Sequence, residues 1–332
     1  MLTYREHYYR IISRKFPKGD NMAGIEDIRV LIQEKAELEA RLSLIPYDGS
    51  PEIKENKSGK YLYVRKRVGG KLTSKYVDVY SDELYQLLLR NTREARELKK
   101  AIRTIDKRLA QTGYKKTDLT ADVILNLDLA RANLKTSIYD QAVLEGVSTT
   151  FPQTEDIIEN GTVNGMTASD VQKILNLKHA WEFILDEDVI QAKSDYYLLC
   201  HIAKIINEGF YSDGGRIRGV PVTIGGCSYV PPIPIESVVK ERLESILDSG
   251  EDDIDIAITM CMYAMRTQVF IDGNKRASVI FANHYLISKG LGIMIVPEKQ
   301  VSKFKKLLVE YYEGNDIRQV KEFLKTYCWI RI

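Results

Sequence analysis

The segment from Ser81 to Gln111 constrains the fold most, because its apolar residues recur in alternating steps of four and three without a break. The stripe consists of Leu84, Leu88, Ala95, Leu98, Ile102, Ile105 and Leu109, with the polar Asn91 at one of its positions. Such a heptad pattern is typical of a long amphipathic helix that packs along one seam against another helix. Ser81 is the predicted N-cap, with Asp82 and Glu83 in the first turn.

A second, weaker stripe runs from Ile25 to Ile45 and is interrupted by Lys35. Its apolar positions are Ile28, Leu31, Leu38, Leu42 and Ile45. The two stripes most simply pair as an antiparallel helical hairpin, a short coiled coil. Dimerisation through the same seam, which would make the protein a homo-oligomer, is the alternative.

Between the two stripes, the sequence KYLYVRKRVGGKLTSKYVDVY alternates with period two around Gly69-Gly70, which predicts a β-hairpin. One face would carry Tyr61, Tyr63, Arg65 and Arg67, with Lys71 and Lys75 nearby. Interleaved aromatic and basic side chains can stack bases and hold phosphates, so residues 60–80 are a candidate nucleic-acid contact. In the competing interpretation this is a small solvated sheet whose tyrosines pack on the helices.

Charge is divided unevenly along the chain. The net charge is +2, but residues 1–118 hold 26 Lys and Arg against 17 Asp and Glu. A basic first part favours an acidic partner, nucleic acid included, although solvated helix faces also give such counts. We expect two domains, a basic coiled-coil and β-hairpin module over residues 1–118 and a second domain over 119–332. Residues 18–23 can be encoded by a purine-rich run resembling a ribosome-binding site before an ATG, so Met22 is a candidate start and residues 1–21 would then not be translated.

Location follows from what the chain lacks. No stretch approaches the roughly 18 uncharged apolar residues of a membrane span, and the first residues have no apolar signal core. The four cysteines are far apart in the sequence, without metal-site spacing or a disulfide framework. The expectation is a cytoplasmic protein with free thiols and no membrane partner.

From Leu119 onward the pattern is mainly helical, with one expected strand pair in RIRGVPVTI before the turn-rich GGCSYVPPIP. Ile254–Met265 and Arg276–Lys289 are expected helices joined by a tight loop, FIDGN. A glycine-containing loop that opens a helix directs backbone N–H groups and the helix dipole at one point, which suits a phosphate. Lys275 and Arg276 add positive charge there. Asp272 could hold Mg²⁺, or could merely cap the turn, and Phe270 is expected to be core.

The sequence QVFIDGNKRAS resembles the central motif of the Fic/Doc (Fido domain) family, His-x-Phe-x-Asp/Glu-Gly-Asn-Gly/Lys-Arg-x-x-Arg. GGRIRGVPVTIGGCSYVPPIP is similar to the flap that positions the target in that family, and AVLEGVSTTFPQTEDIIENG is similar to its regulatory segment. ANHYLISKGLGIMIVPEKQVSKFKKLLVEYYEG resembles the helices that follow the motif. The resemblance covers residues 119–328.

This resemblance implies a mainly α, Fic-type helical domain with a short β-hairpin flap. The family reaction is transfer of AMP from ATP to a hydroxyl of a target protein. By resemblance, Gly273, Asn274, Lys275 and Arg276 would bind the nucleotide, Asp272 would hold Mg²⁺, and Arg218, Val222 and Ile224 would belong to the target flap. Lys275 also matches Doc-type members, which transfer the terminal phosphate instead.

The motif departs from the family at two positions. Gln268 stands where active members have His, and an amide cannot accept the hydroxyl proton near neutral pH. Val279 stands where the last motif Arg is expected, so Glu145, which aligns with the inhibitory glutamate, lacks its usual partner. We therefore expect weakened or altered AMP transfer. The alternatives are Doc-like kinase activity, or an inactive scaffold that binds a nucleotide or a partner, with Glu145 an exposed helix-end carboxylate.

Overall fold

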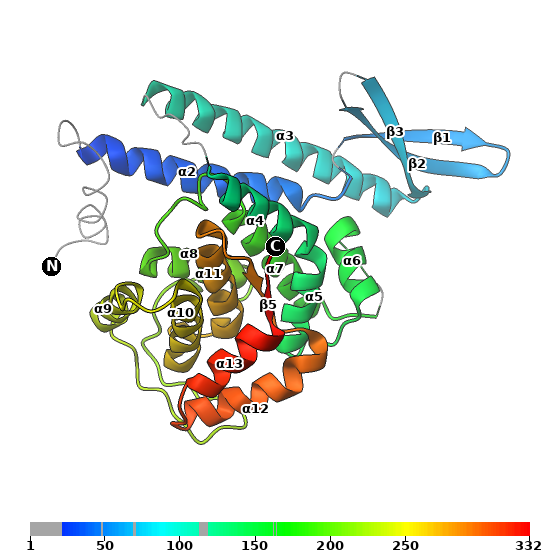
Figure 1. Ribbon diagram of the computed structural model, residues 1–332. Coiled ribbons are helices and arrows are strands. Elements are labelled where there is room, and N and C mark those ends of the chain that lie inside the picture. The colour runs from blue at the N-terminus through cyan, green and yellow to red at the C-terminus, as the bar shows by residue number, and fades with distance from the viewer. Residues whose placement is uncertain (1–21, 48, 69–70, 113–118, 162, 164) are drawn as a thin grey trace. The chain divides into compact units, whose positions relative to one another are not determined.

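The computed structural model describes residues 22–47, 49–68, 71–112, 119–161, 163 and 165–332, which form two compact units (Figure 1). Unit 1 takes in the chain up to Leu42 and Asp48–Thr117, and unit 2 takes in Ser43–Tyr47 and Asp118–Ile332. The candidate untranslated segment, residues 1–21, lies outside the described residues. In the described part of the chain, no helix has both the length and the apolarity that a membrane crossing requires.

Two helices of unit 1, α2 (Met22–Ser43) and α3 (Asp82–Gln111), pack against each other. The Ser81 hydroxyl accepts a hydrogen bond of 3.2 Å from the Leu84 N–H, so α3 begins where the capping pattern predicts. Leu31, midway along α2, packs on Ile105 and Leu109, near the end of α3, and the two helices run in opposite directions, as expected for a helical hairpin (Figure 1). Lys35, which interrupts the stripe, pairs with Asp106 of α3 at 2.9 Å. Homo-oligomerisation stays a prediction.

The remaining part of unit 1 is an antiparallel sheet in the order β1 (Ser50–Asn56), β2 (Gly59–Val68), β3 (Lys71–Val79). The expected hairpin is confirmed as β2–β3, although its turn at Gly69-Gly70 lies outside the described residues. β1 was not anticipated, because SPEIKEN has few strand-forming residues and no clear alternation. Buried Leu62 and Val64 alternate along β2 with the partly exposed Tyr61 and Tyr63.

Unit 2 is mainly α, which confirms the expected fold class. α11 (Asn274–Ser288) is its central helix, since 13 of its 15 residues are buried. It packs against α4 (Ala121–Ala132), α7 (Ala168–Ile184), α8 (Tyr196–Ile206) and α10 (Asp253–Thr267). The other elements are α5 (Leu134–Leu144), α6 (Phe151–Asn160), α9 (Glu236–Leu247), β4 (Ile293–Met294), η1 (Glu298–Gln300), α12 (Val301–Tyr312), α13 (Arg318–Tyr327) and β5 (Trp329–Ile330). A helix that is buried on all sides belongs in the middle of a helical domain.

The flap corrects one expectation. Residues 211–235, all described, contain no strand, so the predicted β-hairpin flap is an irregular loop. Alternation in RIRGVPVTI suggested strands, but proline at 221, 231, 232 and 234 removes backbone donors from any ladder. The Arg218 N–H donates instead to the carbonyl oxygen of Val269 at 2.9 Å, outside the flap. Tertiary contacts therefore override the local pattern.

Candidate functional site

The loop between α10 and α11 turns through two left-handed residues. Gln268, the C-cap of α10, has φ 49° and ψ 61°, and Gly273, the N-cap of α11, has φ 75°. A side chain at Gly273 is excluded by space as well, since a Cβ there would lie 2.7 Å from Ile206 Cγ2. The loop is thus tight enough to place residues 272–276 at the very start of a buried helix.

Asn274 organises this loop from inside. Its Oδ1 accepts a hydrogen bond from the Phe270 N–H (2.9 Å), and its Nδ2 donates to the Phe270 carbonyl (2.8 Å). Phe270 is buried, as expected for a core anchor. The Asn274 side chain is therefore engaged within the loop, and its contribution to an anion would come from its backbone N–H.

The first turn of α11 has no side-chain cap, so its N–H groups remain available. Arg276 lies in this turn and is 2% exposed. Its Nη2 donates to Asp272 Oδ2 at 3.0 Å, whereas Nε and Nη1 are buried without a hydrogen-bond partner. Buried unpaired donors are costly, and a phosphate at this point would satisfy them.

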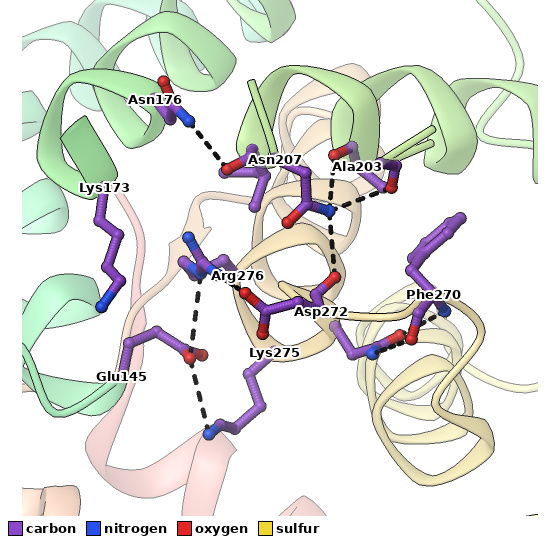
Figure 2. Close-up of polar contacts among 12 residues, drawn as sticks. Glu145, Lys173, Asn176, Ala203, Asn207, Phe270, Asp272, Lys275 and Arg276 are labelled. Carbon is purple, nitrogen blue, oxygen red and sulfur yellow. Dashed lines mark hydrogen bonds and ion pairs between the residues drawn. The ribbon is translucent and has the colours of Figure 1, made fainter. Parts of the chain in front are cut away.

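Glu145, at the end of α5, lies against the same cations (Figure 2). Its Oε2 is 3.6 Å from Lys275 Nζ and 3.9 Å from Arg276 Nε. The arginine expected at position 279 is indeed replaced by buried Val279, but Glu145 pairs with these two other motif residues. Its side chain is 13% exposed, so the exposed helix-end interpretation is wrong.

Gln268 stands where the family motif has His, and both ends of its side-chain amide are hydrogen-bonded. Its Nε2 donates to the Met265 carbonyl at 2.6 Å, and its Oε1 accepts from Asn274 Nδ2 at 3.1 Å. His284 does not replace it as a base, because both ring nitrogens are bonded, one to Ser194 Oγ (2.8 Å) and the other to the Val189 carbonyl (2.9 Å). Burial lowers the pKa of His284 to about 4.

Arg218 anchors the flap. Its guanidinium, in a residue that is 4% exposed, donates to the carbonyl oxygens of Gln268 (2.5 Å) and Pro232 (2.6 Å). Burial lowers the pKa of Arg218 from its ordinary value. The Arg218 side chain thus links the flap to Gln268. Val222 and Ile224, the other predicted flap residues, are half-buried further along the loop.

Two positioning residues were missed as site residues from the sequence. The Nδ2 of Asn207, at the end of α8, lies 3.0 Å from the carbonyl oxygens of both Gly214 and Asp272, so it joins the start of the flap to the loop. Gln141 donates from Nε2 to the Arg276 carbonyl at 2.8 Å and accepts from Trp181 Nε1 at 3.0 Å. No local pattern marks Asn207.

The residues fit a nucleotide with Mg²⁺. The unpaired Arg276 donors, Lys275 and the uncapped N-terminus of α11 suit phosphate oxygens. Asp272 has a carboxylate that is 47% exposed, and Mg²⁺ at phosphate sites commonly takes only one or two protein carboxylates. Among the described residues there is no cluster of three or more His, Cys, Asp or Glu that would form a metal site by itself.

Comparisons agree on this region. A family model described as the Fic/DOC family matches residues 193–286, and one described as a domain of unknown function, DUF6788, matches residues 25–86. The protein adenylyltransferase Fic of Drosophila willistoni is 28% identical over 234 residues, which cover 67% of this chain and 46% of that protein. Its counterpart in Drosophila mojavensis is 27% identical over 267 residues, covering 74% and 52%. The chain thus spans about half the length of these curated relatives.

Among solved structures, Fic-1 from C. elegans shares the fold, with a TM-score of 0.50 and 17% identity over 72% of this chain and 74% of that one. The family match includes the flap, α10 and the loop that leads into α11. Motif, curated relatives and fold agree, and residues 193–286 form a domain of the Fic/DOC family.

Proposed function

We propose that unit 2 binds ATP at the N-terminus of α11 and slowly transfers its AMP group to a hydroxyl side chain of a protein. The observation that carries this proposal is the buried guanidinium of Arg276, two of whose nitrogens have no hydrogen-bond partner. The names of the relatives, protein adenylyltransferase Fic, support AMP as the transferred group.

Several residues at the start of α11 would take part in binding. Arg276 and Lys275 would contact phosphate oxygens, and Gly273 allows the close approach of backbone to phosphate. Glu145 lies close to both cations and would compete with a nucleotide for them. Asp272 would hold Mg²⁺, which supplies neutralisation of phosphate charge.

In the transfer step, the target hydroxyl oxygen attacks the α-phosphorus, the bond from that phosphorus to the bridging oxygen breaks, and pyrophosphate leaves. The hydroxyl proton needs an acceptor. The Gln268 amide does not take a proton near neutral pH, so solvent must accept it. Loss of a general base typically slows such a step by about 10² to 10⁴, which makes slow transfer the expectation.

The partner would be a protein that docks on the flap. Val220 and Val230 are exposed on this loop, and Val222 and Ile224 lie between them. Exposed apolar residues beside an otherwise anchored site suit a protein surface better than a small molecule. The four cysteines are all free, which supports a reducing, cytoplasmic location.

One alternative is transfer of the terminal phosphate, and Lys275 in the Gly/Lys slot favours it. The other is a scaffold without transfer, which the bonded amide of Gln268 favours. ATP labelled at the α or the γ phosphate, incubated with Mg²⁺, the full chain and a cell lysate, separates the three. A protein-bound α label supports AMP transfer, a γ label supports the kinase alternative, and no label above background supports the scaffold.

Binding is tested separately by calorimetry with ATP and Mg²⁺. Arg276→Gln should weaken binding by about tenfold or more, because a charge-assisted hydrogen bond is worth about 1.5–3 kcal/mol. Arg318→Gln is the matched control, since that side chain is 81% exposed and pairs with Asp316 on the surface. Equal affinity in both variants would contradict the assigned site. Lys275→Ala, at a less buried position, repeats the test without a change in the core.

A further inference from the structure

The three-stranded sheet of unit 1 has two unlike faces. Leu62 and Val64 of β2 are buried, so the side of the sheet that they occupy is covered. Tyr61 and Tyr63 alternate with them and therefore lie on the opposite face. The face that carries Tyr61 and Tyr63 is therefore not the one that Leu62 and Val64 share.

Register places a third tyrosine on the same face. Tyr76 of β3 pairs directly with Tyr63, and a bulge beside Tyr63 separates this pairing from that of Leu62. The ring centroids of Tyr76 and Tyr63 lie 5.5 Å apart, and those of Tyr76 and Tyr61 lie 6.3 Å apart. Tyr76 is 48% exposed, so the cluster presents aromatic surface to solvent.

Basic side chains surround these rings. Lys54 of β1 places Nζ 4.2 Å from the centroid of the Tyr63 ring, and Arg65 follows on the same face of β2. Glu52 lies near both cations, 3.7 Å from Lys54 and 3.9 Å from Arg65, and one carboxylate does not neutralise two cations. Residues 50–79 hold eight Lys and Arg against three Asp and Glu. The sheet as a whole is therefore positive, and its tyrosine-bearing face holds Lys54 and Arg65 against Glu52.

We propose that this tyrosine face, formed by Tyr61, Tyr63 and Tyr76 with Lys54 and Arg65, binds single-stranded nucleic acid. Exposed rings offer stacking to bases, and stacking requires bases that are not already paired in a duplex. Neighbouring cations contact the phosphates and give an attraction that salt weakens. The charge and the rings together distinguish this partner from an acidic protein segment, which would use the cations and gain little from the rings.

The test uses the full chain and fluorescence anisotropy with labelled 12-nucleotide oligo-U, oligo-dT and a duplex of equal length. Both single strands should bind, and the duplex should bind at least about tenfold more weakly. The ratio of the affinities for oligo-U and oligo-dT then shows whether the face prefers RNA or DNA. With two or three phosphates contacted, raising salt from about 50 to 200 mM should weaken binding about 5- to 20-fold. Equal affinity for duplex and single strand, or no binding at about 100 µM protein, would overturn the proposal.

Matched variants identify the surface. Tyr76→Leu should weaken single-strand binding about 5- to 100-fold, whereas Tyr76→Phe, which keeps the ring, should bind nearly as the parent does. Arg65→Gln should weaken binding and flatten the salt dependence, whereas Lys107→Gln, an exposed position on α3, should do neither. Equal single-strand affinity of Tyr76→Leu and Tyr76→Phe would show that the ring does not stack on bases and would overturn the proposal. If polyglutamate displaced the labelled oligonucleotide as effectively as unlabelled oligo-U does, the nucleic-acid proposal would be overturned in favour of an acidic protein partner.

Discussion

The side-chain amide of Asn274 donates a hydrogen bond of 3.1 Å to the side-chain oxygen of Gln268. The side-chain amide of Gln268 is thus tied to the residue that organises the loop between α10 and α11, and its nitrogen is tied to the Met265 carbonyl. Arg218 holds the Gln268 carbonyl from the flap side. The left-handed backbone of Gln268 is therefore over-determined by its surroundings, as strained residues in functional sites commonly are.

Gln268→His should raise AMP transfer by about 10² or more, because an imidazole can accept the hydroxyl proton that the amide cannot. The measurement is incorporation of α-labelled phosphate into protein at saturating ATP, with Gln268→Asn as the control that keeps an amide. A histidine variant that binds ATP normally but transfers no more label would contradict this expectation. The missing arginine at Val279 would then be the limiting loss, and the double variant with Val279→Arg would be the next to measure.

Glu145→Gln should increase ATP affinity by about tenfold, or ~1.4 kcal/mol. The carboxylate lies 3.6 Å from Lys275 and 3.9 Å from Arg276, so it opposes the anion that these cations would bind, and the amide keeps its shape without its charge. Calorimetry with ATP and Mg²⁺ measures the change. Glu155→Gln serves as control, since Glu155 pairs with Lys135 elsewhere on unit 2. Unchanged affinity in the Glu145 variant would show that this carboxylate does not restrain the site.

Local patterns predicted much of this structure. The heptad stripe before Leu109 identified α3 and its partner, since helix pairing depends on a regular spacing. The FIDGN loop was predicted because a glycine at the start of a helix allows several backbone N–H groups to point at one place.

Long-range contacts could not be predicted in this way. Nothing near Glu145 in the sequence shows that it pairs with Lys275 and Arg276. Strands were predicted for the flap from its alternation. The Arg218 guanidinium instead donates hydrogen bonds to the carbonyl oxygens of Val220 and Pro232, within the flap, and of Thr267, at the end of α10. β1 was missed because its stability comes from pairing with β2 rather than from its own residues.

Arg218→Lys should loosen the flap while leaving the positive charge in place. Lysine cannot reproduce the fork that contacts carbonyl oxygens on both sides of the flap, and a hydrogen bond to a charged group contributes about 1.5–3 kcal/mol. Hydrogen exchange of the amides between residues 219 and 230 should become about tenfold faster or more. Arg216→Lys is the control, because that side chain is 77% exposed and pairs only with Asp213 among the described residues. Equal exchange in the two variants would show that the flap is held by other contacts.

His284 should make unit 2 less stable in mild acid. Burial lowers its pKa from 6.5 to about 4, so between these values the unfolded chain binds a proton that the folded chain does not. The free energy of unfolding therefore falls as the pH drops through this window, by about 2–3 kcal/mol between pH 7 and 4.5.

Both tryptophans, Trp181 and Trp329, lie in unit 2, so their fluorescence during urea unfolding reports on it. His284→Asn should start from a lower stability at pH 7, having lost packing, yet lose about 2–3 kcal/mol less than the parent on acidification. Parallel losses in the two proteins would mean that the acid sensitivity of this unit comes from its carboxylates and not from the imidazole.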